Sequence, residues 1–191
     1  MAIITLNNRS INRSDTASAD QVWTATSATA SDFQAAGITE ADQWRWTAGF
    51  TGNATPITAN WERNDTSFDK IGTGMSESSG IFTFPSTGIY QVSTFTHMYL
   101  NSDSRYNEIA IQLSTDGGSG YSVIADGYTS ISNNTSLTTY ANVSTNAIID
   151  VTNTSNFKVS IKVTHHDTNT TVAGDSNNNN NATTFIRLGD T

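Results

Sequence analysis

The chain has 191 residues, which is enough for one domain with a sizeable core and a short appendage. Charged residues make up only 14% of it, and 17 acidic against 9 basic side chains give a net charge of −8, which disfavours binding to a nucleic-acid backbone. Because there is no cysteine, a disulfide framework, a thiolate metal site and a cysteine nucleophile are excluded. No apolar run approaches the length of a membrane span, and residues 1–6 are too short for the apolar part of a signal peptide, so we expect neither a membrane partner nor secretion.

Residues 1–40 differ in composition from the rest of the chain. Residues 15–34 are dominated by Ala, Ser and Thr, so this segment cannot bury a core of its own, and two arginines precede the first acidic residue, Asp15. We therefore predict an extended N-terminal docking arm over residues 1–40, with a partly disordered leader as the alternative. The residues expected to bind a partner are Ile3, Ile4, Leu6, Arg9, Ile11, Arg13, Trp23 and Phe33.

From residue 43 onward, short apolar runs recur between turn residues, and no helical period is strong. Residues 43–50 alternate and place two tryptophans, Trp44 and Trp46, on one face, so we predict a single strand there. Further strands are expected over 57–61, 108–113, 121–125, 128–131, 137–143, 147–151 and 157–163, with a polar loop over 101–107, a hairpin turn at 116–120 and a long polar loop over 167–181. Many short strands at turn-marked spacing predict an all-β sandwich.

The stretch 68–98 has the clearest order of elements. Residues 81–84 are β-branched or aromatic, which suits a half-buried sheet surface. Pro85 lacks the N–H that a central ladder needs, and Gly88 accepts the positive φ of a turn, so a turn separates this short strand from a long one over 89–98. On the long strand the alternation predicts two faces, with Tyr90, Val92, Thr94, Thr96 and Met98 on one and Gln91, Ser93, Phe95 and His97 on the other.

This stretch carries a resemblance to a known family. The order Phe-Asp-Lys at 68–70, a polar gap, and Gly-Ile-Phe-Thr-Phe-Pro-Ser-Thr-Gly-Ile-Tyr at 80–90 resembles the core signature of C1q/TNF-like jelly-roll domains. Residues 183–188 also look like that family's C-terminal strand, although its usual Ser or Gly before the last aromatic residue is missing. The resemblance covers residues 43–191 and implies a ten-strand β-sandwich that assembles as a homotrimer, so we expect a jelly-roll knob domain over 41–191. Its core or trimer interface is expected to hold Phe82, Phe84, Tyr90, Phe95, His97 and Phe185.

The opening of the chain has a second resemblance. Residues 1–15, MAIITLNNRSINRSD, followed by QVWTATSATASDF at 21–33, are similar to leaders of virion structural proteins from marine bacteriophages. This implies a place in the virion without saying where. One expectation is a capsid decoration or cement protein whose arm binds the major capsid protein or another virion protein. The alternative is a receptor-binding protein of the tail or a fibre tip, which recognises a host surface glycan or protein.

Few residues suggest a metal site. The densest group of candidate ligands is His165-His166-Asp167, with Asp175 as a third contributor, but neighbouring side chains on a strand point to opposite faces. Candidates for a calcium site are Asp103, Glu108 and Asp126. Their spacing is not that of an oxygen-ligand loop, so we predict neither a metal nor a cofactor.

Catalysis is also not expected. A carboxylate pair would have to come from Glu62, Asp65 and Asp69, and no nucleophile elbow or phosphate-binding glycine loop occurs. The five asparagines at 177–181 have amides that could bind glycans, and the simpler alternative is a flexible loop tip. We therefore predict a non-enzymatic structural protein with no catalytic residue.

Overall fold

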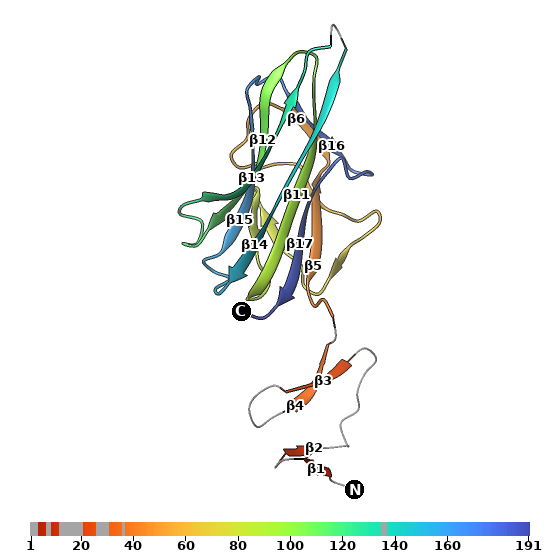
Figure 1. Cartoon of the computed structure of the whole chain (residues 1–191), viewed down its shortest axis with the longest axis vertical. Helices are drawn as coiled ribbons and strands as arrows, with labels where there is room; N and C mark the ends of the chain where they lie inside the picture. The colour runs from red at the N-terminus through yellow and green to blue at the C-terminus, as the bar shows by residue number, and fades with distance from the viewer. Residues whose placement is uncertain (1–3, 7–8, 12–20, 26–30, 36, 135–136) are drawn as a thin grey trace. The chain divides into compact units, whose positions relative to one another are not determined.

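The computed structural model describes residues 4–6, 9–11, 21–25, 31–35, 37–134 and 137–191 (Figure 1). The chain divides into two compact units, Met1–Thr39 and Glu40–Thr191. Every regular element in these described ranges is a β-strand, which confirms the all-β prediction. Among the same residues, no helix is long and apolar enough to cross a membrane.

The N-terminal unit contains two short hairpins. Strand β1 (Ile4–Leu6) pairs antiparallel with β2 (Arg9–Ile11), and β3 (Gln21–Ala25) pairs with β4 (Ser31–Ala35). The registers set Ile4 opposite Ile11 and Trp23 opposite Phe33. The described parts of the predicted arm are therefore hairpins, in which the backbone groups of each strand are paired locally. Two of the expected partner-binding residues, Ile3 and Arg13, lie outside the described residues.

The second unit is a sandwich of two antiparallel sheets, named here the β11 sheet and the β12 sheet. The β11 sheet contains β5 (Ala41–Trp46), β6 (Ala48–Thr51), β7 (Trp61–Arg63), β8 (Lys70–Ile71), β11 (Gly88–Leu100), β14 (Thr139–Val151), β16 (Thr171–Asp175) and β17 (Asn181–Gly189). The β12 sheet contains β9 (Ser76–Ser78), β10 (Ile81–Thr83), β12 (Ser104–Ser114), β13 (Ser122–Ile131) and β15 (Lys158–His165). Figure 1 shows β14, β11, β17 and β5 side by side along one layer.

Strand β11 is the central element of its sheet. It pairs with β14 over its whole length, from Gly88 opposite Val151 to Leu100 opposite Thr139, and with β17 on its other side. Its burial alternates as the sequence predicts: the side chains of Tyr90, Val92, Thr94, Thr96 and Met98 are buried, and the intervening ones are more exposed. Gly88 begins the strand with a φ of 143°, and a Cβ there would lie 2.6 Å from the Gly189 carbonyl oxygen, so the position requires glycine.

Aromatic rings fill the centre of the sandwich. Phe82 is fully buried and packs edge-on against Trp61, with ring centroids 4.8 Å apart. Its contact with Phe185 is tilted, with ring centroids 5.1 Å apart. Phe84 lies 4.7 Å from Tyr90 and extends the same cluster. Of the six expected core or interface residues, Phe82, Phe84, Tyr90 and Phe185 are thus in the core of one chain, whereas Phe95 and His97 lie on the opposite face of β11.

Three predicted boundaries are wrong in the first half of the knob. The single strand over 43–50 is two strands, because the chain bends at Thr47, whose N–H donates to the carbonyl of Asn60, and β5 and β6 then pair with different neighbours. The strand expected over 57–61 begins only at Trp61, since Ile57 makes a single backbone hydrogen bond to Ile161 and no ladder. The loop expected over 101–107 ends at Ser104, where β12 begins.

Because of turn residues, the prediction also divided two strands that are continuous in the structure. The separate strands expected at 121–125 and 128–131 are one strand, β13, and those at 137–143 and 147–151 are one strand, β14. The loop expected over 167–181 contains β16, because Val172 is fully buried and pairs with both β6 and β11. Pairing with distant segments overrides the local polarity in each case.

Candidate interaction face

The side chains of β11 that point away from the core form one surface with their cross-strand neighbours on β14 and β17. This surface, called the β11 face below, consists of Ile89, Gln91, Ser93, Phe95, His97 and Tyr99 on β11, Tyr140, Asn142, Ser144, Asn146, Ile148 and Asp150 on β14, and Thr184 and Ile186 on β17. Within this set, Asp150 is the one residue with a carboxylate, ammonium or guanidinium group, and it pairs with Ile89 at one end of the ladder. The β11 face is therefore a long surface of apolar, aromatic, amide and hydroxyl groups.

Large apolar side chains on this surface are exposed to solvent. Ile148 is 68% exposed, Tyr140 61% and Phe95 38%. The outward face of the β12 sheet is different, because it carries charged side chains such as Glu108 and Lys162. Exposed apolar groups on a surface with few charged side chains are typical of a protein-protein interface.

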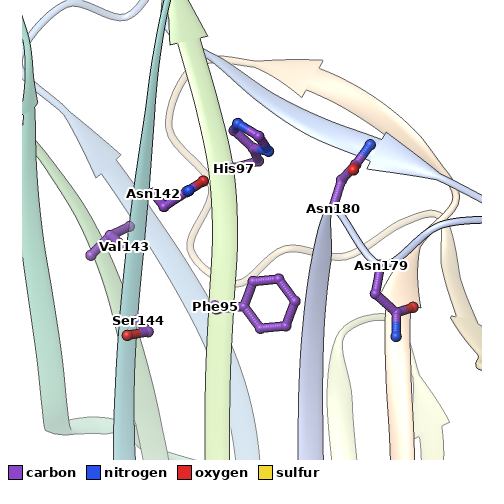
Figure 2. Close-up of a pocket in the computed structure, with 7 residues that line it drawn as sticks. All are labelled: Phe95, His97, Asn142, Val143, Ser144, Asn179 and Asn180. Atoms are coloured by element: carbon purple, nitrogen blue, oxygen red, sulfur yellow. The ribbon is translucent and has the colours of Figure 1, made fainter.

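The upper half of the β11 face is hollowed on both sides of His97, forming what is called the His97 groove. One hollow of about 390 Å³ is lined by Phe95, His97, Asn142, Val143, Ser144, Asn179 and Asn180 (Figure 2). The adjoining hollow of about 290 Å³ is lined by Gly49, His97, Tyr99, Tyr140, Ala173, Gly174 and Asn180. In Figure 2 the rings of Phe95 and His97 lie between Asn142 on β14 and the two asparagines that precede β17.

Neutral groups hold His97 in place. Its backbone N–H donates to the carbonyl of Asn180 at 2.9 Å, and its ring lies edge-on to the ring of Tyr140, with centroids 5.5 Å apart and planes at 73°. The ring of Tyr99 also packs on Tyr140, with ring centroids 5.5 Å apart. The described residues that line the groove include no carboxylate and no ammonium or guanidinium group, and their rings and amides offer stacking and hydrogen bonding.

One wall of the groove is the loop between β16 and β17. Backbone N–H groups of Asn177 and Asn178 donate to the carboxylate of Asp175, and these bonds lower the pKa of Asp175 below its ordinary value. Asn179 donates to the side-chain oxygen of Gln43 at 2.9 Å. The fifth asparagine, Asn181, is fully buried and joins β5 to β16 through its amide, so this part of the expected loop belongs to the core.

The structure does not bring together the residues that were considered as metal ligands. His165 is buried, and burial lowers its pKa to about 4, while the neighbouring His166 is exposed and accepts hydrogen bonds from Arg105. The carboxylate of Asp175 accepts hydrogen bonds within its own loop, from the backbone N–H groups of Asn177 and Asn178, and not from this pair of histidines. Within the described ranges, no group of three His, Asp or Glu side chains is placed to hold a metal ion.

Most of the remaining carboxylate candidates have structural partners. Glu108 forms an ion pair with Lys162 at 3.0 Å, and Asp126 lies beside the hydroxyl of Tyr128. Glu62 and Asp65 both meet the guanidinium of Arg45, whereas Asp69 and Asp103 are exposed and take no part in these contacts. The side chains of the N-terminal hairpins are outside what the structure describes.

Sequence reasoning identified Phe95 and His97 but missed their neighbours in the groove. Tyr140 and Asn142 lie directly opposite Tyr99 and His97 on β14. The signal that could have found them is the alternation of Ala141, Val143 and Ala147 with larger or more polar residues, which predicts a strand with Tyr140 and Asn142 on its outer face.

Two antiparallel sheets with β5, β17, β11 and β14 adjacent in one layer define a jelly-roll β-sandwich of the C1q/TNF-like type. No family model and no curated protein matches the sequence. Among solved structures, the chain is similar to murine APRIL at pH 5.0, with a TM-score of 0.56 and 11% identity over 78% of this chain and 98% of that one. It is also similar to the Eiger TNF of S. frugiperda, with a TM-score of 0.57 and 10% identity over 81% of this chain and 96% of that one. At these identities the likeness shows the fold alone, and it confirms the predicted fold class.

Proposed function

We propose that the protein is a non-enzymatic structural protein of a bacteriophage particle, a capsid decoration or cement protein. In this proposal the jelly-roll knob assembles as a homotrimer through the β11 face, and the N-terminal arm binds the major capsid protein or another virion protein. The observation that carries the proposal is the β11 face, on which Phe95, Tyr140 and Ile148 are exposed in a surface that has almost no charge.

The dimensions of the β11 face suit self-association. Strands β11 and β14 each have 13 residues, and β17 has 9. At about 3.3 Å per residue and about 4.8 Å between strands, these three strands offer roughly 550 Å² of flat sheet, which is smaller than the ~800 Å² per partner of a standard interface but of the same order. A closed cyclic assembly lets the same face serve every copy, and the threefold is what the family resemblance implies.

The composition of the leader supports a tethering role for the arm. Arg9 and Arg13 precede the first acidic residue, so this end is locally basic on a chain whose net charge is −8. Short strands such as β1 and β2 can add to the exposed edge of a partner's sheet. Three arms on one trimer would multiply weak contacts with the particle through effective concentration.

Deleting residues 1–34 tests the tether. We expect the truncated protein to keep the mass of the full-length assembly and to lose its binding to particles that lack the protein. Equal decoration by the truncated and full-length proteins would refute the tethering role of the arm. Copy number tests the place in the particle, since hundreds of copies indicate decoration and a few dozen or fewer indicate the receptor-binding role at the tail.

A further inference from the structure

A β-bulge at the start of β12 presents two consecutive side chains to solvent. The ladder with β13 shifts register between Ser104 and Asn107, which are both fully buried. Arg105 and Tyr106 lie between them, and both are exposed. In a regular strand one of these two side chains would point into the core, so the bulge is what places both on the outer surface.

Tyr106 is the centre of a group of rings contributed by three segments. Its ring centroid lies 6.5 Å from that of Tyr128 on β13, with planes at 71°, and 5.8 Å from that of His166 after β15, with planes at 69°. The guanidinium of Arg105 donates to Nε2 of His166, with nitrogen-nitrogen distances of 3.0 and 2.6 Å. These four residues are called the Tyr106 cluster, and Tyr128 is 60% exposed in it.

Buried polar groups beneath the surface hold the cluster in position. The Ser104 hydroxyl donates to the side-chain oxygen of Asn107 at 3.0 Å, and Nδ1 of His165 contacts the same oxygen at 3.0 Å. The backbone N–H of His166 donates to the carbonyl of Tyr106 at 2.9 Å, which ties the strand end to the bulge. Among the described residues, Nε2 of His165 and Nδ2 of Asn107 have no partner although both are buried. The hydrogen bonds beneath the surface therefore join the bulge to the end of β15.

The charges around the cluster give no net positive field. Arg105 and Lys162 contribute two positive charges, Glu108 and Asp126 contribute two negative ones, and Asp103 and Asp167 adjoin the cluster along the chain. Desolvation first, and then the neighbouring Glu108 and Asp126 carboxylates, raise the pKa of the Tyr128 hydroxyl. A phosphate chain or another anionic ligand finds no complementary field on such a surface.

We propose that the Tyr106 cluster is a carbohydrate-binding site and that its ligand is a neutral saccharide. A pyranose ring has a C–H face that packs on an aromatic ring and a rim of hydroxyls that pair with charged side chains. The rings of Tyr106 and Tyr128 provide the first contact, and the exposed guanidinium of Arg105 lies beside them. All of these residues belong to one chain, so the site does not depend on the proposed trimer or on the arm.

The cluster is open to solvent, so a single saccharide is expected to bind with a Kd on the order of millimolar. The test is a titration of the ¹⁵N-labelled full chain with the methyl glycosides of glucose, galactose, mannose and N-acetylglucosamine, each to about 50 mM, followed by amide chemical shifts. We expect at least one of the four to shift resonances of the Tyr106 cluster and to leave those of the β11 face unchanged. If none of the four shifts the cluster, the proposal is overturned.

Variants locate the contact. Tyr128→Ala should weaken binding about tenfold through loss of a stacking contact, whereas Tyr128→Phe should keep most of it. Phe68→Ala removes an exposed aromatic ring that belongs to neither the Tyr106 cluster nor the β11 face, and it should bind as the unaltered chain does. Tyr106→Ala alters the bulge itself and can therefore fail to fold. Tyr128→Ala then decides the result. Undiminished binding by Tyr128→Ala, or loss of binding in Phe68→Ala, would place the site elsewhere and overturn the proposal.

Discussion

The guanidinium of Arg45 donates a hydrogen bond to the main-chain carbonyl of Ser176, so a strand at the start of the knob holds the loop that walls the His97 groove. The Arg45 side chain is only 1% exposed, and its charge is compensated by Glu62 at 3.0 Å and Asp65 at 2.9 Å. A guanidinium can serve three acceptors at once because its donors form a planar fork. The position of the wall therefore depends on an ion-pair network that starts more than a hundred residues earlier in the chain.

Replacing Arg45 should weaken both the fold and the groove. We expect Arg45→Met to lower the free energy of unfolding by about 2 kcal/mol, which is less than the loss of a fully buried pair because Asp65 is exposed. Amide hydrogen exchange in residues 176–180 should also become faster. Urea denaturation measures the first effect, and Lys70→Met, which alters an exposed lysine, is the control and should change stability very little. Equal urea midpoints for Arg45→Met and the unaltered chain would contradict this account of the network.

Acid should destabilise the knob through His165. Burial lowers the pKa of His165 to about 4 from an ordinary value of 6.5, so below pH 6.5 the unfolded chain takes up a proton that the folded chain does not. The stabilisation from neutral His165 is complete above pH 6.5 and is lost as the pH falls towards 4, by up to about 3 kcal/mol.

The measurement for His165 is urea denaturation across this pH range. His165→Gln should remove most of the dependence on pH, whereas His166→Gln should keep it, because His166 is exposed. Comparing the variants with the unaltered chain separates His165 from the carboxylates that titrate at the acid end of the range. A pH profile that is the same in His165→Gln and in the unaltered chain would show that this residue is not the cause.

Alternation within one strand was enough to predict much of the fold. The side chains of Tyr90 and Val92 face the core, and those of Phe95 and His97 face outward, as the period of two requires. The same reasoning failed at Thr47 and across β16, because a backbone bend and the burial of Val172 depend on pairing with strands far away in the sequence. Local pattern records which face a residue belongs to, and it does not record which strand will lie beside it.

The candidate sites were harder to predict than the fold. The His97 groove needs Tyr140 from β14 and Asn180 from the loop before β17, which only the three-dimensional structure brings to His97. Consecutive exposure of Arg105 and Tyr106 depends on a bulge that violates the alternation on which the sequence prediction relied.

A buried and an exposed aromatic ring of the sandwich should respond differently to replacement by alanine. Phe82→Ala removes a fully buried ring that contacts Trp61 and Phe185, and we expect it to lower the free energy of unfolding by about 4 kcal/mol. Phe95→Ala removes a ring that is 38% exposed, and its effect on the stability of the isolated knob should be below about 1 kcal/mol. Thermal or urea unfolding compares the two variants. Similar losses in both would mean that Phe95 is part of the core.

A charge placed on the β11 face should prevent assembly without unfolding the knob. Ile148 is 68% exposed in one chain, so Ile148→Lys costs little by itself, but in an assembly through this face the ammonium would lose its hydration. We expect the unaltered chain to have a solution mass three times the 20.5 kDa of one chain and Ile148→Lys to have the mass of a single chain, measured by light scattering. The matched control is Val123→Lys on β13, where the side chain is 43% exposed and lies on the β12 sheet, and this variant should remain assembled. If Val123→Lys dissociates and Ile148→Lys does not, the copies associate through the β12 sheet instead, because a lysine disrupts only the surface that becomes buried.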